Sequence, residues 1–339
     1  MKSLLIFTFL SLNSFAKMQS LPKLVPTPKD NKITNSKIHL GKTLFFDPRL
    51  SSNGTISCNS CHNVMAGGED NRSVSVGVLN QRGGRSAPTV WNAAFQTTQF
   101  WDGRAASLEA QAVGPITNPI EMGMKDFKQV TERLKSIPGY VKMFNKSFGK
   151  NSINKKNIGK AIATFERTLI TRNSPFDKYI NGNKKALGKS ALRGMKLVEE
   201  VGCTACHTGV NFSGEGFKMG EGNFQKFPTF ANNNFVKKYK FSNDLGLYEQ
   251  TKQDDDKNMW RVPTWRNVAL TAPYFHNGSV KTLAEAVRVM AKTQLDTDLK
   301  AKQVKDIVAF LNSLTGQLPK ITAPHLPLTP GTTLIKLEY

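Results

Sequence analysis

Two short segments decide the fold: Cys58-Asn-Ser-Cys61-His62 and Cys203-Thr-Ala-Cys206-His207. They hold all four cysteines of the chain, and each has the spacing C-x-x-C-H, the attachment signature of c-type haem. Two thiols on one helical turn can both add to the vinyl groups of a porphyrin, and the adjacent histidine then reaches the iron. A redox disulfide or half a zinc site also uses C-x-x-C. A histidine directly after both pairs favours haem, since the whole chain has only five histidines.

The motifs therefore predict two covalently bound c-type haems, with His62 and His207 as proximal iron ligands. A chain of 339 residues also has the length of about two domains. One small cytochrome-like domain around each motif accounts for both observations. No cysteine is left for a disulfide.

Residues 1–16, MKSLLIFTFLSLNSFA, have the layout of a cleaved signal peptide: one lysine, an apolar run, and small residues before Lys17. A buried N-terminal helix is the alternative. The apolar run is too short to span a bilayer, which takes about 20 residues, and no later stretch approaches that length. We expect export to the periplasm and no integral membrane segment.

The chain is strongly basic, with a formal charge of +22 at pH 7. Loss of Lys2 with the signal peptide would lower this to +21. A charge of this size is compatible with binding to nucleic acid, to an anionic membrane or to an acidic protein. The Lys and Arg residues are scattered without an aromatic-interleaved patch, which argues against nucleic acid. A solvated surface that docks acidic protein partners is the simplest interpretation.

Apolar periodicity predicts helices rather than strands. The predicted segments are 38–45 and 191–201 before the two motifs, 157–170 as the end of the first domain, and 283–291 and 299–314 near the end of the second. The fold class is thus mainly α: two cytochrome c-like haem domains with long loops, packed face to face. Their predicted limits are 17–175 and 176–315, followed by an extended, proline-rich tail at 316–339.

Four further segments resemble the bacterial dihaem cytochrome c peroxidase family. They are GKTLFFDPRLS (41–51), FWDGRA (100–105), GPITNPIEM (114–122) and TAPYFHNGS (271–279). The resemblance runs from about residue 38 to 315, with order and spacing preserved. It implies a peroxidatic haem in the N-terminal domain and an electron-transfer haem in the C-terminal domain. MauG-type enzymes, which oxidise protein tryptophans, belong to the same superfamily.

The resemblance also implies an axial methionine on the electron-transfer haem. Met290, fourteen residues after His276, occupies that position. A His/Met pair raises the haem potential and suits electron entry. On spacing alone, Met290 would more simply be a core residue. MauG-type proteins have tyrosine there, so Met290 favours a peroxidase.

Three other positions match catalytic residues of the family. Glu121 matches the glutamate that moves a proton between the two peroxide oxygens, and Gln111 matches a distal amide that can hydrogen-bond peroxide. Trp101 matches a tryptophan lying between the haems, where it would help electron transfer or simply fill the domain junction. Arg261 matches a position at the domain interface.

The family also binds one calcium ion between its domains. The matching positions are Ser86, Thr271 and Pro273, whose backbone carbonyls suit a hard cation. This chain departs from the family at Ser86, where asparagine is usual. The shorter side chain can still ligate, or a water can replace it.

A larger departure lies at Val78, where many relatives have a histidine that caps the oxidised peroxidatic iron. Valine cannot ligate, and the unassigned His39, His276 and His325 do not match that loop. We expect this haem to be five-coordinate or water-bound when oxidised, so that no reductive activation is needed. The weak ligands that remain conceivable are Met65, Met122 and Met124.

Together these features predict a periplasmic dihaem cytochrome c peroxidase. It would reduce hydrogen peroxide to water with electrons from a small redox protein, a cytochrome c or a cupredoxin. The resemblance also implies a homodimer. Two alternatives stay open: a MauG-like oxidase of protein side chains, and a non-enzymatic dihaem electron carrier.

Overall fold

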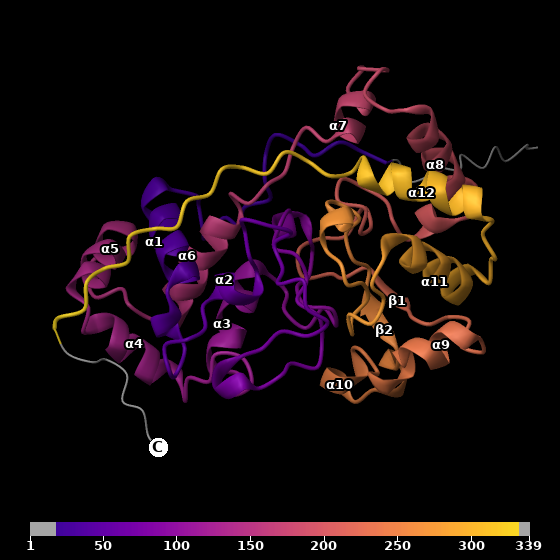
Figure 1. Cartoon of the computed structure of the whole chain (residues 1–339). Coiled ribbons are helices and arrows are strands. Elements are labelled where there is room, and N and C mark those ends of the chain that lie inside the picture. Colours follow the sequence, from indigo (N-terminus) through magenta and orange to yellow (C-terminus); the bar gives the residue numbers. More distant parts are fainter. Residues whose placement is uncertain (1–17, 332–339) are drawn as a thin grey trace, which may run out of the picture.

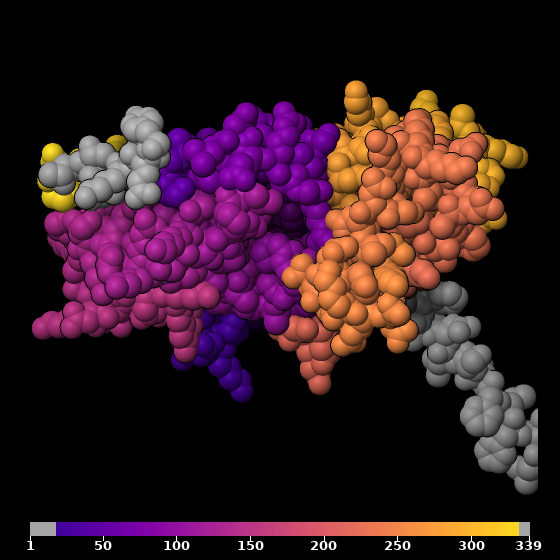
Figure 2. Space-filling model, turned by 90° about the horizontal axis from the view of Figure 1, so that it is seen from below, coloured from indigo at the N-terminus to yellow at the C-terminus, as the bar shows by residue number. Residues whose placement is uncertain are grey.

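A computed structural model describes residues 18–331, so the predicted signal peptide lies outside the described residues. The chain forms two groups of helices that lie side by side (Figure 1). We call α1–α6 with their loops the N-terminal half, and α7–α12 with their loops the C-terminal half. In the space-filling view of Figure 2 the two halves meet along one seam.

The helices of the N-terminal half are α1 (Asn35–Phe46), α2 (Cys58–Cys61), α3 (Leu108–Thr117), α4 (Phe127–Lys135), α5 (Pro138–Phe148) and α6 (Lys155–Glu166). Those of the C-terminal half are α7 (Pro175–Ile180), α8 (Lys189–Glu200), α9 (Asn234–Tyr239), α10 (Tyr248–Thr251), α11 (Leu283–Leu295) and α12 (Ala301–Asn312). The strands β1 (Phe224–Lys226) and β2 (Met259–Arg261) pair antiparallel, with Phe224 opposite Arg261.

The mainly helical fold predicted from sequence is confirmed. The five predicted helices are present as α1, α6, α8, α11 and α12, and α11 extends one turn beyond the predicted segment. The small sheet was not predicted, because strands of three residues leave no alternating pattern to detect. Local signals explain the helix ends. Thr34 caps the first turn of α1 by accepting from the Lys37 amide, and the Asp47 amide closes its last turn.

Each haem motif is preceded by a helix that crosses the last helix of its half. α1 packs on α6, and α8 packs on α12. Both crossings use a glycine: a side chain at Gly41 would overlap the carbonyl oxygen of Ala161, and one at Gly194 would overlap that of Asp306. The same close approach of two backbones therefore occurs twice, once beside each motif.

Separate hydrophobic clusters fill the two halves. The cluster of the N-terminal half is built on buried side chains such as Leu44, Tyr140 and Phe165. The C-terminal half has one cluster around Phe176, Phe212 and Phe310, and a second made of Phe227, Val236, Phe241, Trp260, Tyr274, Val280 and Val289. We call this second group the α11 cluster. Each half thus has its own core.

Both ends of the described chain cross the seam. Near the N-terminus, Met18 packs in the C-terminal half, whereas Asn31 bonds to the carbonyl of Lys160 in the N-terminal half. The segment after α12 runs back over the N-terminal half (Figure 1). There Ile321 packs against the core, and the carbonyl of Pro327 accepts from Arg49 at 2.9 Å. The two halves are therefore held together by chain segments that cross between them as well as by side-chain contacts.

Within residues 18–331, no helix is both long enough and apolar enough to cross a membrane.

The glycine crossings yield a stability prediction. Gly41→Ala should lower the free energy of unfolding by about 1–3 kcal/mol, because a methyl group must push the α1 and α6 backbones apart. Gly188→Ala is the matched control, since a methyl group there meets no atom within 4 Å. Denaturant unfolding of the two purified variants measures the difference. Equal stabilities would contradict the close-packing account.

Candidate functional site

The first motif forms a single helical turn. Cys58 and Cys61 are the first and last residues of α2, and the His62 amide donates to the Cys58 carbonyl at 2.9 Å. The second motif is a tighter turn, Cys203–Ala205, closed by the His207 amide on the Cys203 carbonyl at 3.1 Å. All four cysteines are free thiols. Both turns therefore present two uncommitted sulfurs beside a histidine.

Both motif histidines are oriented by one hydrogen bond. Nδ1 of His62 lies 3.0 Å from the carbonyl oxygen of Pro88, and Nδ1 of His207 lies 2.9 Å from that of Phe212. A carbonyl can only accept, so each Nδ1 carries the hydrogen and each Nε2 keeps a free lone pair. This is the tautomer that a metal-ligating histidine needs.

Burial keeps these rings neutral. It lowers the pKa of His62, and it lowers the pKa of His207 to about 4. The His207 ring also stacks on Trp265, with centroids 4.3 Å apart. Two thiols, a neutral imidazole with a free Nε2 and an apolar surround together fit a c-type haem at each motif.

Glu121 lies in the loop after α3 and is brought to the first motif. Its negative charge acts on the thiols of both Cys58 and Cys61. Its Oε2 is buried and has no hydrogen-bond partner among the described residues. Burial raises the pKa of Glu121, against the opposing charge of Arg104 and a hydrogen bond with Asn118. An acid with a raised pKa therefore stands beside the first motif.

Gln111 lies on α3, the helix that leads into the Glu121 loop. Its side chain is partly exposed and makes no hydrogen bond within residues 18–331. The backbone turns back at the end of α3, where the Met122 amide donates to the Pro115 carbonyl at 3.2 Å. The structure thus places Gln111 on the element before Glu121.

The segment around Val78 is a short hairpin that holds the Glu121 loop. Val76 pairs with Arg82, and the Val78 amide donates to the Glu121 carbonyl at 2.9 Å. Val78 is only 2% exposed, and a side chain at Gly77 would overlap the backbone of Glu121. The hairpin therefore works as a support for Glu121.

The histidines and methionines that the sequence leaves unassigned lie in varied environments. His39 and His325 are exposed, whereas His276 is buried and its ring stacks on Trp260 at 4.1 Å. Met122 and Met124 are buried in the core of the N-terminal half, and Met65 is 54% exposed.

Met290 lies on α11, which Thr282 caps at its start. Its partly buried side chain packs against the α11 cluster, and Trp101 packs against the same cluster from the N-terminal half. The predicted axial methionine and the predicted inter-haem tryptophan therefore share one apolar surround.

Trp101 is held from both halves. Its indole Nε1 donates to the Ser86 carbonyl at 2.9 Å, and its own carbonyl accepts from the Arg261 amide at 3.0 Å. The Arg261 side chain is buried and donates to the Phe100 carbonyl at 2.9 Å. Burial lowers the pKa of Arg261 to about 10. Trp101 thus sits at the seam in a fixed orientation.

Ser86 joins the two halves at the segment that carries Thr271 and Pro273. Its amide donates to the His276 carbonyl at 2.7 Å. Within residues 18–331, the carbonyl oxygens of Thr271 and Pro273 accept no hydrogen bond. These two acceptors therefore remain available near Ser86.

Sequence reasoning missed an ionic link across the seam. Arg85 bonds the carboxylate of Asp244 through Nε and Nη2, at 2.7 and 2.8 Å, and also reaches Asp102 at 2.6 Å. Asp102 is fully buried and also pairs with Arg104 at 2.9 Å. A sequence carries no signal for a pair 159 residues apart. Beside this link lies a cleft of about 700 Å³, lined in part by Asp244 and His276.

Sequence reasoning also missed Glu166, although its spacing along the chain indicates a buried position. It follows Ile158 and Ile162 at steps of four residues, which places all three on one face of α6. That face is buried, so a carboxyl on it is unusual.

Comparisons with known proteins place the chain among di-haem peroxidases and MauG proteins. A family described as di-haem cytochrome c peroxidase matches residues 35–185. Cytochrome c551 peroxidase of Pseudomonas aeruginosa is 43% identical, over 94% of this chain and 90% of its own length. Methylamine utilization protein MauG of Methylorubrum extorquens is 36% identical, over 90% of this chain and 86% of its own length. The crystal structure of a MauG-like protein associated with microbial copper homeostasis superposes with a TM-score of 0.77, at 30% identity, and covers 87% of this chain and 95% of that one.

The motif geometry predicts the effect of removing one attachment site. A chain carrying both Cys58→Ala and Cys61→Ala should hold one covalent haem instead of two, and the reciprocal change at Cys203 and Cys206 should do the same. Intact mass and haem absorbance per chain measure the count. Peptide mapping of the wild-type protein adds a check that does not depend on folding of the variants. A motif peptide without haem would contradict the assignment.

Proposed function

The chain belongs to the di-haem cytochrome c peroxidase family, and from that premise we propose that it reduces hydrogen peroxide at its first haem motif with electrons that enter at its second. As a member of this family it is an oxidoreductase that acts on peroxide. The family binds two c-type haems, in keeping with two C-x-x-C-H motifs in one chain. The observation that carries the proposal is Glu121, an acid beside the first motif whose buried Oε2 has no hydrogen-bond partner within residues 18–331.

The bound haem iron supplies the position at which peroxide binds and the electrons that cleave its O–O bond. Glu121 takes a proton from the inner peroxide oxygen and returns it to the outer oxygen, which leaves as water. Its pKa is raised by burial, which makes the carboxylate a stronger base toward the peroxide proton than an exposed glutamate is. Gln111 orients the peroxide by hydrogen bonding. In sum, one peroxide takes up two electrons and two protons and yields two waters.

Electrons pass between the halves through Trp101 in this proposal. The tryptophan is held by Ser86 on one side and by Arg261 on the other, so its ring cannot reorient freely. Met290 shares its apolar surround and would, together with His207, hold the iron of the electron-transfer haem. A methionine at this position favours a peroxidase over a MauG-like oxidase.

A calcium ion is proposed between the halves. The hydrogen bond from Ser86 to His276 supports it, because it brings Ser86 to the segment with the two available carbonyls of Thr271 and Pro273. Oxygen ligands of this kind suit calcium.

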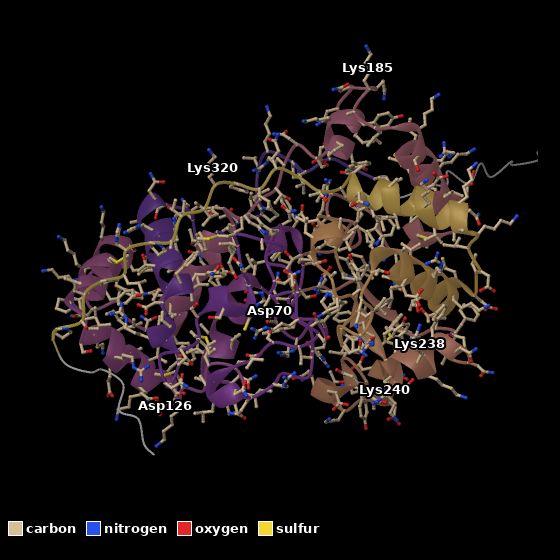
Figure 3. All side chains as sticks on the ribbon, viewed as in Figure 1. Asp70, Asp126, Lys185, Lys238, Lys240 and Lys320 are labelled. Atoms are coloured by element: carbon tan, nitrogen blue, oxygen red, sulfur yellow. The ribbon has the colours of Figure 1, made fainter. Side chains whose placement is uncertain are left out.

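The electron donor is proposed to be a small acidic redox protein in the periplasm. Lysines project from well-separated parts of the surface: Lys185 and Lys238 on the C-terminal half, and Lys320 on the segment that runs over the N-terminal half (Figure 3). A basic surface of this kind attracts an acidic donor and loses that attraction as salt screens it. We also propose that the predicted signal peptide directs export to the periplasm and that the protein forms a homodimer.

Glu121→Gln tests the catalytic step. It should lower kcat/KM for peroxide by about 10²- to 10⁴-fold, the usual contribution of a general acid–base group. Glu132→Gln removes the same charge from an exposed position on α4 and should leave the rate unchanged. Steady-state turnover of haem-replete variants measures the effect. Full activity in Glu121→Gln would remove this mechanism.

Val78 predicts the state of the oxidised protein. The N-terminal haem should give a high-spin ferric EPR signal, because the hairpin offers no imidazole as a sixth ligand. Cyanide, which takes an open sixth position, should convert that signal to low spin. A bis-histidine low-spin signal from the N-terminal haem in the untreated protein would contradict the prediction.

A further inference from the structure

Glu166 is the last residue of α6 and one of the most buried acids of the chain, at 3% exposure. Its helix face is shared with Ile158 and Ile162, which are also buried. Helix geometry therefore directs the carboxyl into the interior of the N-terminal half. The catalytic proposal above gives it no role.

An ion pair does not account for this acid. The neighbouring cation, Arg167, is committed to Glu109 through two hydrogen bonds of 2.7 and 3.0 Å, and also to the Pro26 carbonyl. Within residues 18–331 the Glu166 side chain makes no hydrogen bond, and its Oε2 is fully buried. A buried carboxyl without a partner costs stability, so its presence calls for another explanation, such as a redox or catalytic role.

The group that Glu166 faces is the first haem attachment site. Burial, and after it the negative charge of Glu166, raises the pKa of the Cys58 thiol. Glu166 acts on this thiol more strongly than Glu121 does. Cys58 also packs against the core cluster that contains Ile158 and Ile162, the two residues that share the α6 face of Glu166. The carboxyl therefore lies on the side of α6 that faces the cysteine to which the haem would attach.

The charges around Glu166 leave it neutral at pH 7. Burial raises its pKa to about 8, Arg167 opposes this rise, and Glu109 on α3 adds to it. Within residues 18–331, Cys58 on α2 is a further titratable neighbour, and it no longer titrates once its sulfur carries the haem. A neutral acid this close to a redox centre responds to the charge of that centre.

We propose that Glu166 is a redox-linked proton site of the N-terminal haem pocket, holding a proton when the haem is reduced and releasing it when the haem is oxidised. The inference rests on the proposed haem at the first motif. On oxidation, one electron leaves the haem for peroxide or for an added oxidant, the O–H bond of Glu166 breaks, and the proton passes to water. The carboxylate then balances the added positive charge. Reduction reverses both transfers.

The test is the midpoint potential of the N-terminal haem as a function of pH. In the wild-type protein the potential should fall as pH rises from about 6 to 10, because loss of the Glu166 proton favours the oxidised haem. Glu166→Gln, which has no such proton, should lose this part of the pH dependence and keep a higher potential at alkaline pH. Glu132→Gln is the matched control and should follow the wild-type curve.

Infrared difference spectra between oxidised and reduced protein provide a second measurement that needs no folded Glu166 variant. The spectra are recorded on the Glu121→Gln variant, so that Glu121 cannot contribute. They should show an absorption band of a protonated carboxyl group that disappears on oxidation. A potential curve unchanged in Glu166→Gln, or infrared spectra without this band, would overturn the inference. Both measurements are made without peroxide, so a failure of peroxide turnover would count against the proposed function alone.

The pH dependence of stability provides an independent test of the protonation state of Glu166. Because folding raises the pKa of Glu166, its contribution to stability is present at acid pH and is lost as pH rises through about 8. The unfolding free energy of the wild-type protein should therefore fall relative to that of Glu166→Gln as pH rises from 4.5, the ordinary pKa of the group, to about 8, its pKa in the folded protein. A constant difference would contradict a buried neutral acid.

Discussion

The hydrogen bond from Nδ1 of each motif histidine to a backbone carbonyl is the contact on which the two sites depend. It selects the tautomer with a free Nε2, and it ties each motif to the loop that follows: Pro88 in one half, Phe212 in the other. Those loops are long and have little regular structure. The loop of the N-terminal half also carries Val78 and Ser86, and the loop of the C-terminal half leads into β1. The orientation of each motif histidine therefore depends on the loop that follows it.

The two halves are alike in construction and different in chemistry. Each has a glycine-mediated helix crossing beside its motif, at Gly41 and at Gly194. Among the described residues, carboxyl oxygens that are buried without a hydrogen-bond partner belong to Glu121 and Glu166, and both acids act on Cys58 of the N-terminal half. The C-terminal half instead surrounds Met290 with aromatic and aliphatic side chains. The proposed proton-handling site and the proposed electron-transfer site are thus built on the same arrangement of two crossing helices.

The sequence predicts the parts of this account that rest on local pattern. Helices α1, α6, α8, α11 and α12 carry apolar residues at helical spacing, and the two motifs are contiguous. The contacts across the seam are beyond such reasoning, because Arg85 and Asp244 have no local signal and three-residue strands have no period. Glu166 lies between these cases: its spacing from Ile162 places it on a buried face, but only the packed structure shows that it lacks a partner.

The central claim is that the N-terminal haem pocket is ready for peroxide without prior reduction, since Val78 supports the Glu121 loop and offers no ligand. Stopped-flow mixing of the fully oxidised, as-isolated protein with one equivalent of hydrogen peroxide tests it directly. The account predicts an immediate change in the haem spectrum together with consumption of the peroxide. No reaction until the C-terminal haem has been reduced would contradict it.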